Sequence, residues 1–232
     1  MPLTHPPNIV HPYIAKSCAS WTDADLRLCN VNIVDVGPST FFDIQDLPDP
    51  SVSPAILNAK LSYRQQPQPP HTHTALTNEE RIFFQNLQAA MEPGPHQHAA
   101  VVEFTLHLLH VLGFTQPNTS KQDAGKERRV LRREHDLPLF MCGRTVHAIA
   151  DICLLVSSTS SLDGDTVLLL VKATSPTTTT VTETSSTSST RASAAEAQLF
   201  AQAVAAFQCE NRARRRARLP PIETQVIPAM LV

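Results

Sequence analysis

The chain has 232 residues, of which 42% are hydrophobic, so it can bury the core of one ordinary domain or of two small ones. Its formal net charge of −2 excludes neither acidic nor basic partners, because the arginines are clustered. Five cysteines without a CxxC pair do not fit a disulfide scaffold, and no apolar run is long enough for a signal peptide or a membrane span. These features predict an intracellular protein, cytoplasmic or nuclear, with no membrane partner.

Residues 1–76 are interrupted repeatedly by proline, as in "GPSTFFDIQDLPDPSVSPAILNAKL". Proline fixes φ and cannot donate a backbone hydrogen bond, so this spacing disfavours regular elements. We therefore expect an irregular, proline-rich N-terminal arm that lies over the core, and we place the start of the compact domain at residue 77.

Two helices are predicted next, within residues 77–113. Thr77 and Glu80 have the spacing of a capping box, and apolar residues then recur at helical intervals until a Pro-Gly pair. The second helix runs from about His98 to Leu112, with a broad apolar face and a glycine as its stop.

The charged residues 115–138 are predicted to form an exposed connection with a short helix at its basic end, "KERRVLRRE". A strand follows over residues 144–158, and after an Asp-Gly turn "TVLLLVK", residues 166–172, forms its hairpin partner. This second strand is apolar on both faces and should lie centrally in a sheet covered on two sides. Cys142 and Cys153, beside and within these strands, are expected to be small buried apolar residues.

Residues 174–190 contain fourteen serines and threonines among seventeen residues. Such a tract cannot bury enough apolar surface to offset its ordering entropy, so we expect a disordered insert. Ser193 and Glu196 then have the spacing of a second capping box at the start of a long helix. One more short strand near the end completes an α/β fold, a central mixed sheet flanked by helices, within residues 77–232.

Asp151 is the residue whose position points to chemistry. It lies inside the apolar strand "VHAIADICLLV", where a carboxylate is costly unless it is paired, hydrogen-bonded or bound to a metal. A carboxylate on one strand, with an acid and a lysine on the next, is an arrangement that could cleave phosphodiesters. The two acids would hold a divalent cation and the lysine would orient the attacking water.

Several stretches resemble a family of uncharacterised proteins of basidiomycete fungi whose core is similar to that of restriction-endonuclease-like, PD-(D/E)XK, nucleases. These stretches are "WTDADLRLCNVNIVDVGPSTFFDI", "FFQNLQAAMEPGPHQHAAVVEFTLHLLHVLGF", "CGRTVHAIADICLLV", "LLLV" and "EAQLFAQAVAAFQ". The resemblance implies a restriction-endonuclease-like sandwich. It also implies a metal-binding acid and a catalytic lysine on the strand after Asp151.

The second-strand motif departs from the pattern of that family. Where relatives read "LLLVQEDK", this chain reads "LLLVKATS", so Ala173 stands in place of the acid and Ser175 in place of the lysine. Using Lys172 as the lysine instead puts Leu170 at the position of the acid. In either register the second acid is missing.

The remaining polar residues match supporting positions of that fold. The resemblance implies that Asp151 is the strand aspartate, that Glu103 is an extra acid used by some members, and that Gln198 faces the active site. We therefore expect a degenerate nuclease fold without catalytic activity or a cofactor. The first alternative is a Mg²⁺-dependent nuclease in which Asp151 and Glu103 hold the metal and Lys172 assists. The second alternative is a scaffold or interaction protein with no nucleic-acid role.

The run "RARRRAR" is the candidate nucleic-acid contact. Its members are Arg212, Arg214, Arg215, Arg216 and Arg218. A nuclear import signal is the other functional interpretation of the run. The neutral interpretation, which the sequence favours, is a solvated helix end whose positive charge complements the helix dipole. No aromatic residue interleaves with the arginines, so the sequence does not indicate base stacking.

Two histidine pairs, His71 with His73 and His96 with His98, have a spacing that zinc sites use. Both pairs lie in polar, proline-rich segments, and no cysteine stands at a metal-binding distance along the chain. We therefore expect solvent-exposed histidines rather than a zinc site.

Overall fold

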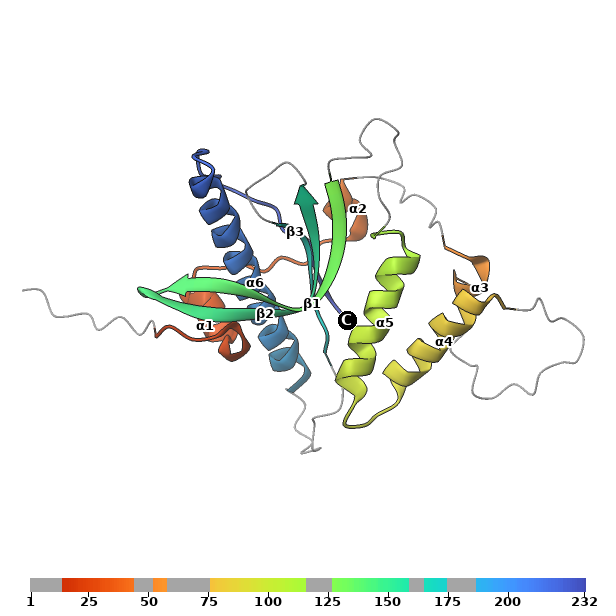
Figure 1. Ribbon diagram of the computed structural model, residues 1–232. Coiled ribbons are helices and arrows are strands. Elements are labelled where there is room, and N and C mark those ends of the chain that lie inside the picture. The colour runs from red at the N-terminus through yellow and green to blue at the C-terminus, as the bar shows by residue number, and fades with distance from the viewer. Residues whose placement is uncertain (1–13, 44–51, 58–75, 116–126, 159–164, 175–186) are drawn as a thin grey trace, which may run out of the picture.

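The computed structural model describes residues 14–43, 52–57, 76–115, 127–158, 165–174 and 187–232. Its helices are η1 (Cys18–Ser20), α1 (Asp23–Leu28), α2 (Pro38–Phe42), α3 (Pro54–Leu57), α4 (Asn78–Met91), α5 (Gln97–Val111) and α6 (Thr187–Arg216). Its strands are β1 (Glu127–Met141), β2 (Arg144–Ser158), β3 (Thr166–Lys172) and β4 (Ala229–Leu231) (Figure 1). Within these ranges, no helix combines the length and apolar character needed to cross a membrane.

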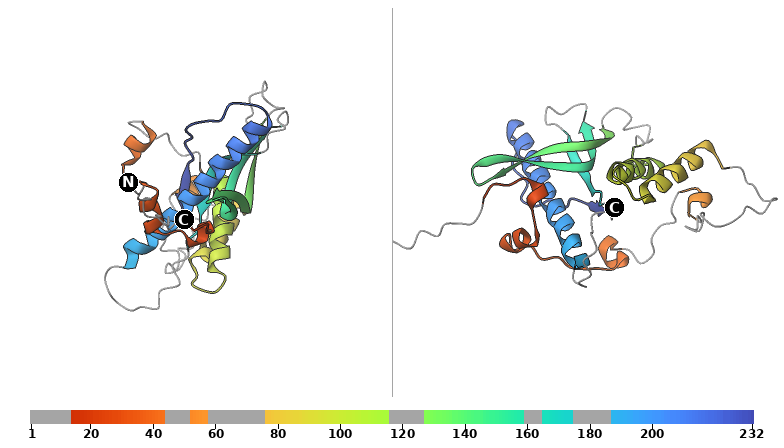
Figure 2. Two further views of the ribbon diagram at one scale, coloured as in Figure 1. Left: turned by 90° about the vertical axis from the view of Figure 1, so that its left-hand side faces the viewer. Right: turned by 90° about the horizontal axis from the view of Figure 1, so that it is seen from below.

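The four strands form one mixed sheet in the order β1-β2-β3-β4. The first three strands are antiparallel, and β4 runs parallel to β3. Helix α6 packs against one face of this sheet, while α5, backed by α4, packs against the other (Figures 1 and 2). The predicted α/β class with a mixed sheet flanked by helices is confirmed, and β3 lies centrally, as its apolar run predicts.

The prediction of an exposed connection with a short helix before residue 138 is wrong, because the structure forms strand β1 there. The segment pairs with β2 along nearly its whole length and has no strand on its other side in the described sheet. An edge strand of this kind can keep charged side chains in solvent, and Arg132 and Arg133 are exposed accordingly. The side-chain amide of Gln208 in α6 bonds both backbone groups of Phe140, at 2.7 Å and 3.1 Å, and so covers part of the open edge.

The long β1–β2 hairpin changes face near its middle. Ala150 packs in the cluster with α6, whereas Ile152 packs in the cluster with α5. Residues two apart on a regular strand point to the same face, so the alternation has shifted by one position. Glu134, opposite Asp151, has φ 45° and is skipped in the ladder. Asp151 therefore lies where the hairpin passes from one layer of the fold to the other.

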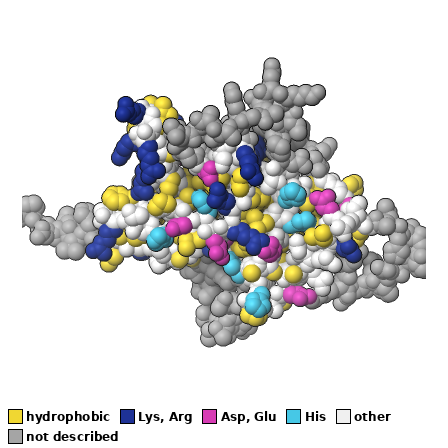
Figure 3. Space-filling view, viewed as in Figure 1, with side chains coloured by type: hydrophobic (Ala, Val, Ile, Leu, Met, Phe, Trp, Pro, Cys, Tyr) yellow, Lys and Arg dark blue, Asp and Glu magenta, His cyan; other side chains and the backbone are white. Residues whose placement is uncertain are grey.

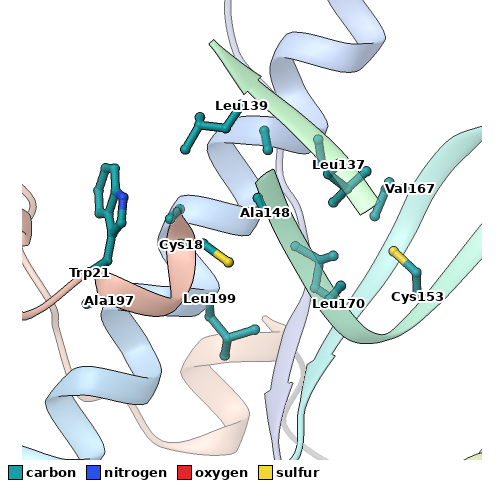
Figure 4. Close-up of a cluster of buried hydrophobic side chains, with 14 of the residues drawn as sticks. Cys18, Trp21, Leu137, Leu139, Ala148, Cys153, Val167, Leu170, Ala197 and Leu199 are labelled. Atoms are coloured by element: carbon teal, nitrogen blue, oxygen red, sulfur yellow. The ribbon is translucent and has the colours of Figure 1, made fainter. Parts of the chain in front are cut away.

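Part of the segment predicted to be an irregular arm belongs to the core. Cys18, Trp21 and Leu26 are each at most 4% exposed and pack with β1, β2 and α6. Figure 4 shows this cluster, in which Cys18 points toward the strands and Trp21 lies beside α6. The compact unit therefore includes residues that precede position 77.

Helix α1 fixes this N-terminal segment locally. The backbone N–H and the hydroxyl of Thr22 both donate to Asp25, at 2.7 Å and 2.9 Å, and Lys16 lies 2.5 Å from the same carboxylate. Burial alone would raise the pKa of Asp25, but the hydrogen bonds from Lys16 and Thr22 outweigh it and hold that pKa below its usual value. The N-terminal segment is thus anchored by the ionised carboxylate of Asp25, which caps the start of α1.

Of the two predicted capping boxes, the one at the start of α4 is confirmed and the one at the start of α6 is wrong. Thr77 and Glu80 form the predicted capping box of α4. Helix α6 instead begins at Thr187, so Ser193 is not its N-cap and the end of the predicted disordered insert 174–190 is helical. The rest of that insert from residue 175 on, like the Asp-Gly turn, lies outside the described residues.

The turn between β1 and β2 is made by Cys142 and Gly143, with φ 50° and 75°. Two positive φ values in a two-residue turn match the twist of the flanking strands and favour Asn-Gly. Cys142 is exposed there, so the prediction that it is buried is wrong. Cys153 is buried as predicted, and burial raises the pKa of its thiol to about 12.

Replacing Cys142 with asparagine is expected to raise the free energy of unfolding by about 0.5 to 1 kcal/mol, because asparagine tolerates the left-handed region better. The midpoint of urea unfolding measures the change. Cys142→Ala removes the thiol without this backbone preference and serves as the control. Equal stabilisation by both substitutions would contradict the explanation.

Candidate functional site

Asp151 and Lys172 lie together at the centre of the sheet. The antiparallel register pairs Ile152 with Val171, which brings Asp151, the residue before Ile152, beside Lys172, the residue after Val171. Lys172 Nζ lies 3.2 Å from Asp151 Oδ1 and 3.0 Å from Oδ2. Their side chains are 20% and 12% exposed, so each charge depends largely on the other for compensation.

The backbone supplies a further donor to this carboxylate. The N–H of Ala173 donates to Asp151 Oδ2 at 2.8 Å. Both carboxylate oxygens therefore accept a hydrogen bond from β3 or from the residue after it. In the position where the resemblance implies a second acid, the chain contributes a peptide N–H and a buried methyl group.

His98 is a neighbour of Asp151 that sequence reasoning missed. It lies in the first turn of α5, and its Nε2 is 4.0 Å from Asp151 Oδ1, while its side chain remains 52% exposed. The predicted exposure of this histidine is confirmed, but the sequence contained no signal of its proximity to the strand. His71 and His73 lie outside the described residues.

Glu103 is turned away from this group. Its carboxylate pairs with Arg133 of β1, and its side chain is half exposed. At 100° per residue, the five positions between His98 and Glu103 separate them by about 140° around the helix axis. A helix that directs His98 at Asp151 therefore directs Glu103 elsewhere, toward the edge strand. The structure does not bring the two predicted metal ligands together.

The glutamine next to the candidate site is Gln202 rather than Gln198. Gln198 donates to the carbonyl of Ala19 at 3.2 Å, so it holds the N-terminal segment instead of facing Asp151. Gln202, one turn further along α6, is 1% exposed and donates to the carbonyl of Ile149 at 2.9 Å. Its spacing of four residues from Gln198 is the sequence signal that could have found it.

Cys18 fills the space beside Gln202. Its thiol is 4.0 Å from the same Ile149 carbonyl, and burial raises its pKa. A neutral, buried thiol is a packing group rather than a nucleophile. The side of the strand next to the ion pair is thus occupied by protein atoms.

This donor set does not fit a hard divalent cation. Such an ion takes several oxygen ligands, and a hydrolytic site needs two carboxylates side by side. The Asp151 carboxylate is held by an ammonium and a peptide N–H, and the Glu103 carboxylate is held by a guanidinium. Among the residues that the structure describes, no three histidine, cysteine or acidic side chains are grouped to hold a metal.

The arginine run divides into structural and free members. Arg214 Nε donates to the carbonyl of Pro220 at 2.8 Å and so closes the end of α6. The guanidinium of Arg212 lies 6.0 Å from the ring centroid of Phe140. Arg215, Arg216 and Arg218 are exposed. Figure 3 shows Lys and Arg side chains gathered over this end of α6, at its upper left.

The arrangement can therefore do two things. The Asp151–Lys172 pair can join β2 to β3, and the end of α6 can present positive charge to an anionic partner.

A scan of protein-family models and searches of curated proteins and of solved structures found no match to this chain.

Proposed function

We propose that this protein has a restriction-endonuclease-like core that is catalytically inactive and that contacts nucleic acid through the arginines at the end of α6. The observation that carries the proposal is the ion pair between Asp151 and Lys172. The ammonium stands beside the carboxylate where a catalytic cation would have to bind. The mixed sheet flanked by helices, with the aspartate on β2 and the lysine on β3, supports the restriction-endonuclease-like core.

Electrostatic attraction holds the Asp151–Lys172 pair closed, and the missing second acid disfavours a metal in its place. Two unit charges 3 Å apart attract by about 5 kcal/mol at an effective dielectric constant of about 20. A divalent cation would have to displace Lys172 and would then find one carboxylate and no second acid at Ala173. The ammonium of Lys172 contacts both oxygens of Asp151, so orienting an attacking water would compete with this ion pair.

The nucleic-acid part of the proposal depends on the free arginines. None of the ion pairs within the described residues involves Arg215, Arg216 or Arg218, so their charge is uncompensated by contact. Guanidinium groups bind phosphate oxygens through paired N–H donors. Each phosphate contact releases counterions, which makes such binding sensitive to salt.

Cleavage and binding assays test the two parts separately. With Mg²⁺ or Mn²⁺ we expect no cleavage of a labelled duplex or of its separated strands, and no difference between the wild type and Asp151→Ala. We expect binding by fluorescence anisotropy, with a salt slope reduced by about 2 to 3 in the Arg215→Ala/Arg216→Ala/Arg218→Ala variant. Metal-dependent cleavage that Asp151→Ala abolishes would overturn the proposed inactivity. Absence of both cleavage and binding would favour a scaffold.

A further inference from the structure

We propose that Phe140 and the arginine face of α6, defined as Arg212, Arg215 and Arg216, form a surface for single-stranded nucleic acid. An unpaired base would stack on the phenyl ring while the guanidinium groups contact the phosphates on either side. This inference rests on the proposed nucleic-acid contact and specifies which form of nucleic acid the surface accepts.

Phe140 is an exposed aromatic side chain on a fixed support. It is 51% exposed, although it lies in a strand whose neighbours Leu139 and Met141 face the core. Its backbone N–H donates to Gln208 Oε1 at 2.7 Å, and its carbonyl accepts from Gln208 Nε2 at 3.1 Å. The ring is therefore presented to solvent from a backbone tied to β2 on one side and to α6 on the other.

Three arginines lie on the same face of α6 as Gln208, next to the Phe140 ring. Gln208, which holds Phe140, is followed by Arg212 four residues on and by Arg215 and Arg216 seven and eight residues on. These positions share one face of a helix. The guanidinium of Arg212 lies over the Phe140 ring at 6.0 Å, which confirms that the face points toward the hairpin. An aromatic ring thus lies at one end of a row of cations.

The acids near this row form no ion pairs with its arginines among the described residues. The carboxylate of Asp136 on β1 accepts a hydrogen bond from His147, whose Nδ1 lies 2.7 Å away. Glu210 on α6 accepts a hydrogen bond from Thr166 at 3.0 Å. Glu223 follows Ile222, whose backbone is hydrogen-bonded to Asn211 of α6. Among the described residues, none of these three acids forms an ion pair with an arginine of the row, so the guanidinium groups stay available to a phosphate.

The exposed ring is what favours a single strand over a duplex. Stacking on an aromatic side chain requires a base with a free face, and the bases of a duplex are already stacked on one another. Phosphate contacts alone would not distinguish the two forms. A cation 6 Å from the ring centroid is at the outer limit of a cation–π contact, so a base can replace it and leave Arg212 to a phosphate.

Fluorescence anisotropy with a labelled single strand and its duplex tests the surface in the full chain. We expect Phe140→Leu to weaken single-strand binding about tenfold and to leave duplex binding unchanged. Phe140→Tyr keeps the ring and should retain wild-type affinity for the single strand. Phe114→Leu, after α5 on the other side of the sheet, is the matched control and should change neither affinity.

The outcomes separate the inference from the function on which it rests. If the wild type binds neither probe, both the nucleic-acid contact and the surface are wrong. If the wild type binds and Phe140→Leu changes neither affinity, or lowers both equally, the stacking surface is overturned while the contact stands. Thermal unfolding of each variant shows whether a loss of binding reflects a loss of folding.

Discussion

Replacing Lys172 with methionine is expected to lower the free energy of unfolding by about 2 to 3 kcal/mol. The substitution keeps the apolar stem but removes the only cation within 3.2 Å of Asp151 among the described residues. A carboxylate that is 12% exposed would then retain only the Ala173 N–H as a donor. Removing one partner of a buried ion pair costs about 3 to 5 kcal/mol, and partial access to water reduces that figure here. Urea unfolding measures the loss.

A double variant distinguishes the contribution of the ion pair to stability from that of side-chain packing. Asp151→Asn combined with Lys172→Met removes both charges, so it should recover most of the stability lost in Lys172→Met alone. Arg27→Met breaks the exposed pair with Asp23 and should cost about 0.5 kcal/mol or less, which provides the matched control.

The stability of Lys172→Met in the presence and absence of Mg²⁺ tests whether a cation can replace the ammonium. If the donor set does not fit a metal, Mg²⁺ should leave the stability of Lys172→Met unchanged. Restoration of that stability by Mg²⁺ would show that a cation takes the place of the ammonium, because a ligand stabilises the state that binds it. The ion pair would then no longer support a catalytically inactive core.

The features that could be predicted from the sequence are those whose causes are local. The apolar run of β3 requires burial on both faces, and the capping box at Thr77 satisfies its own helix end. Asp151 was recognisable because a charge within an apolar strand needs a partner. That its partner would be Lys172, in an ion pair rather than a metal site, depends on the register between two strands.

The features that could not be predicted depend on neighbours distant in sequence. The charged residues of β1 resemble an exposed helix, because an edge strand leaves the same side chains in solvent. Phe140 and Arg212 are in contact in the structure but are far apart along the sequence, with β2, β3 and most of α6 between them. The sequence around the arginines therefore shows no aromatic residue. Glu103 was the expected partner of Asp151, but the direction of a helical side chain follows from how the helix docks.

Trp21→Ala is expected to lower the free energy of unfolding by about 3 to 4 kcal/mol, although Trp21 lies in the segment that the sequence suggested was an irregular arm. The indole is 3% exposed and its ring lies 6.1 Å from that of Phe200 in α6. Truncating a buried aromatic side chain to alanine costs about 3 to 5 kcal/mol through lost contacts and the cavity that remains. Urea or thermal unfolding measures the effect.

Two further substitutions determine how Trp21 acts. Its indole N–H is buried and has no hydrogen-bond partner within the described part of the chain. Trp21→Phe keeps most of the apolar surface and removes that unpaired donor, so it should cost about 1 kcal/mol or less. Phe41→Ala, at a position that is 66% exposed, should cost less than about 1 kcal/mol. If Trp21→Ala were as mild as Phe41→Ala, the N-terminal segment would not be part of the cooperative core, and the folded unit would begin near residue 77 after all.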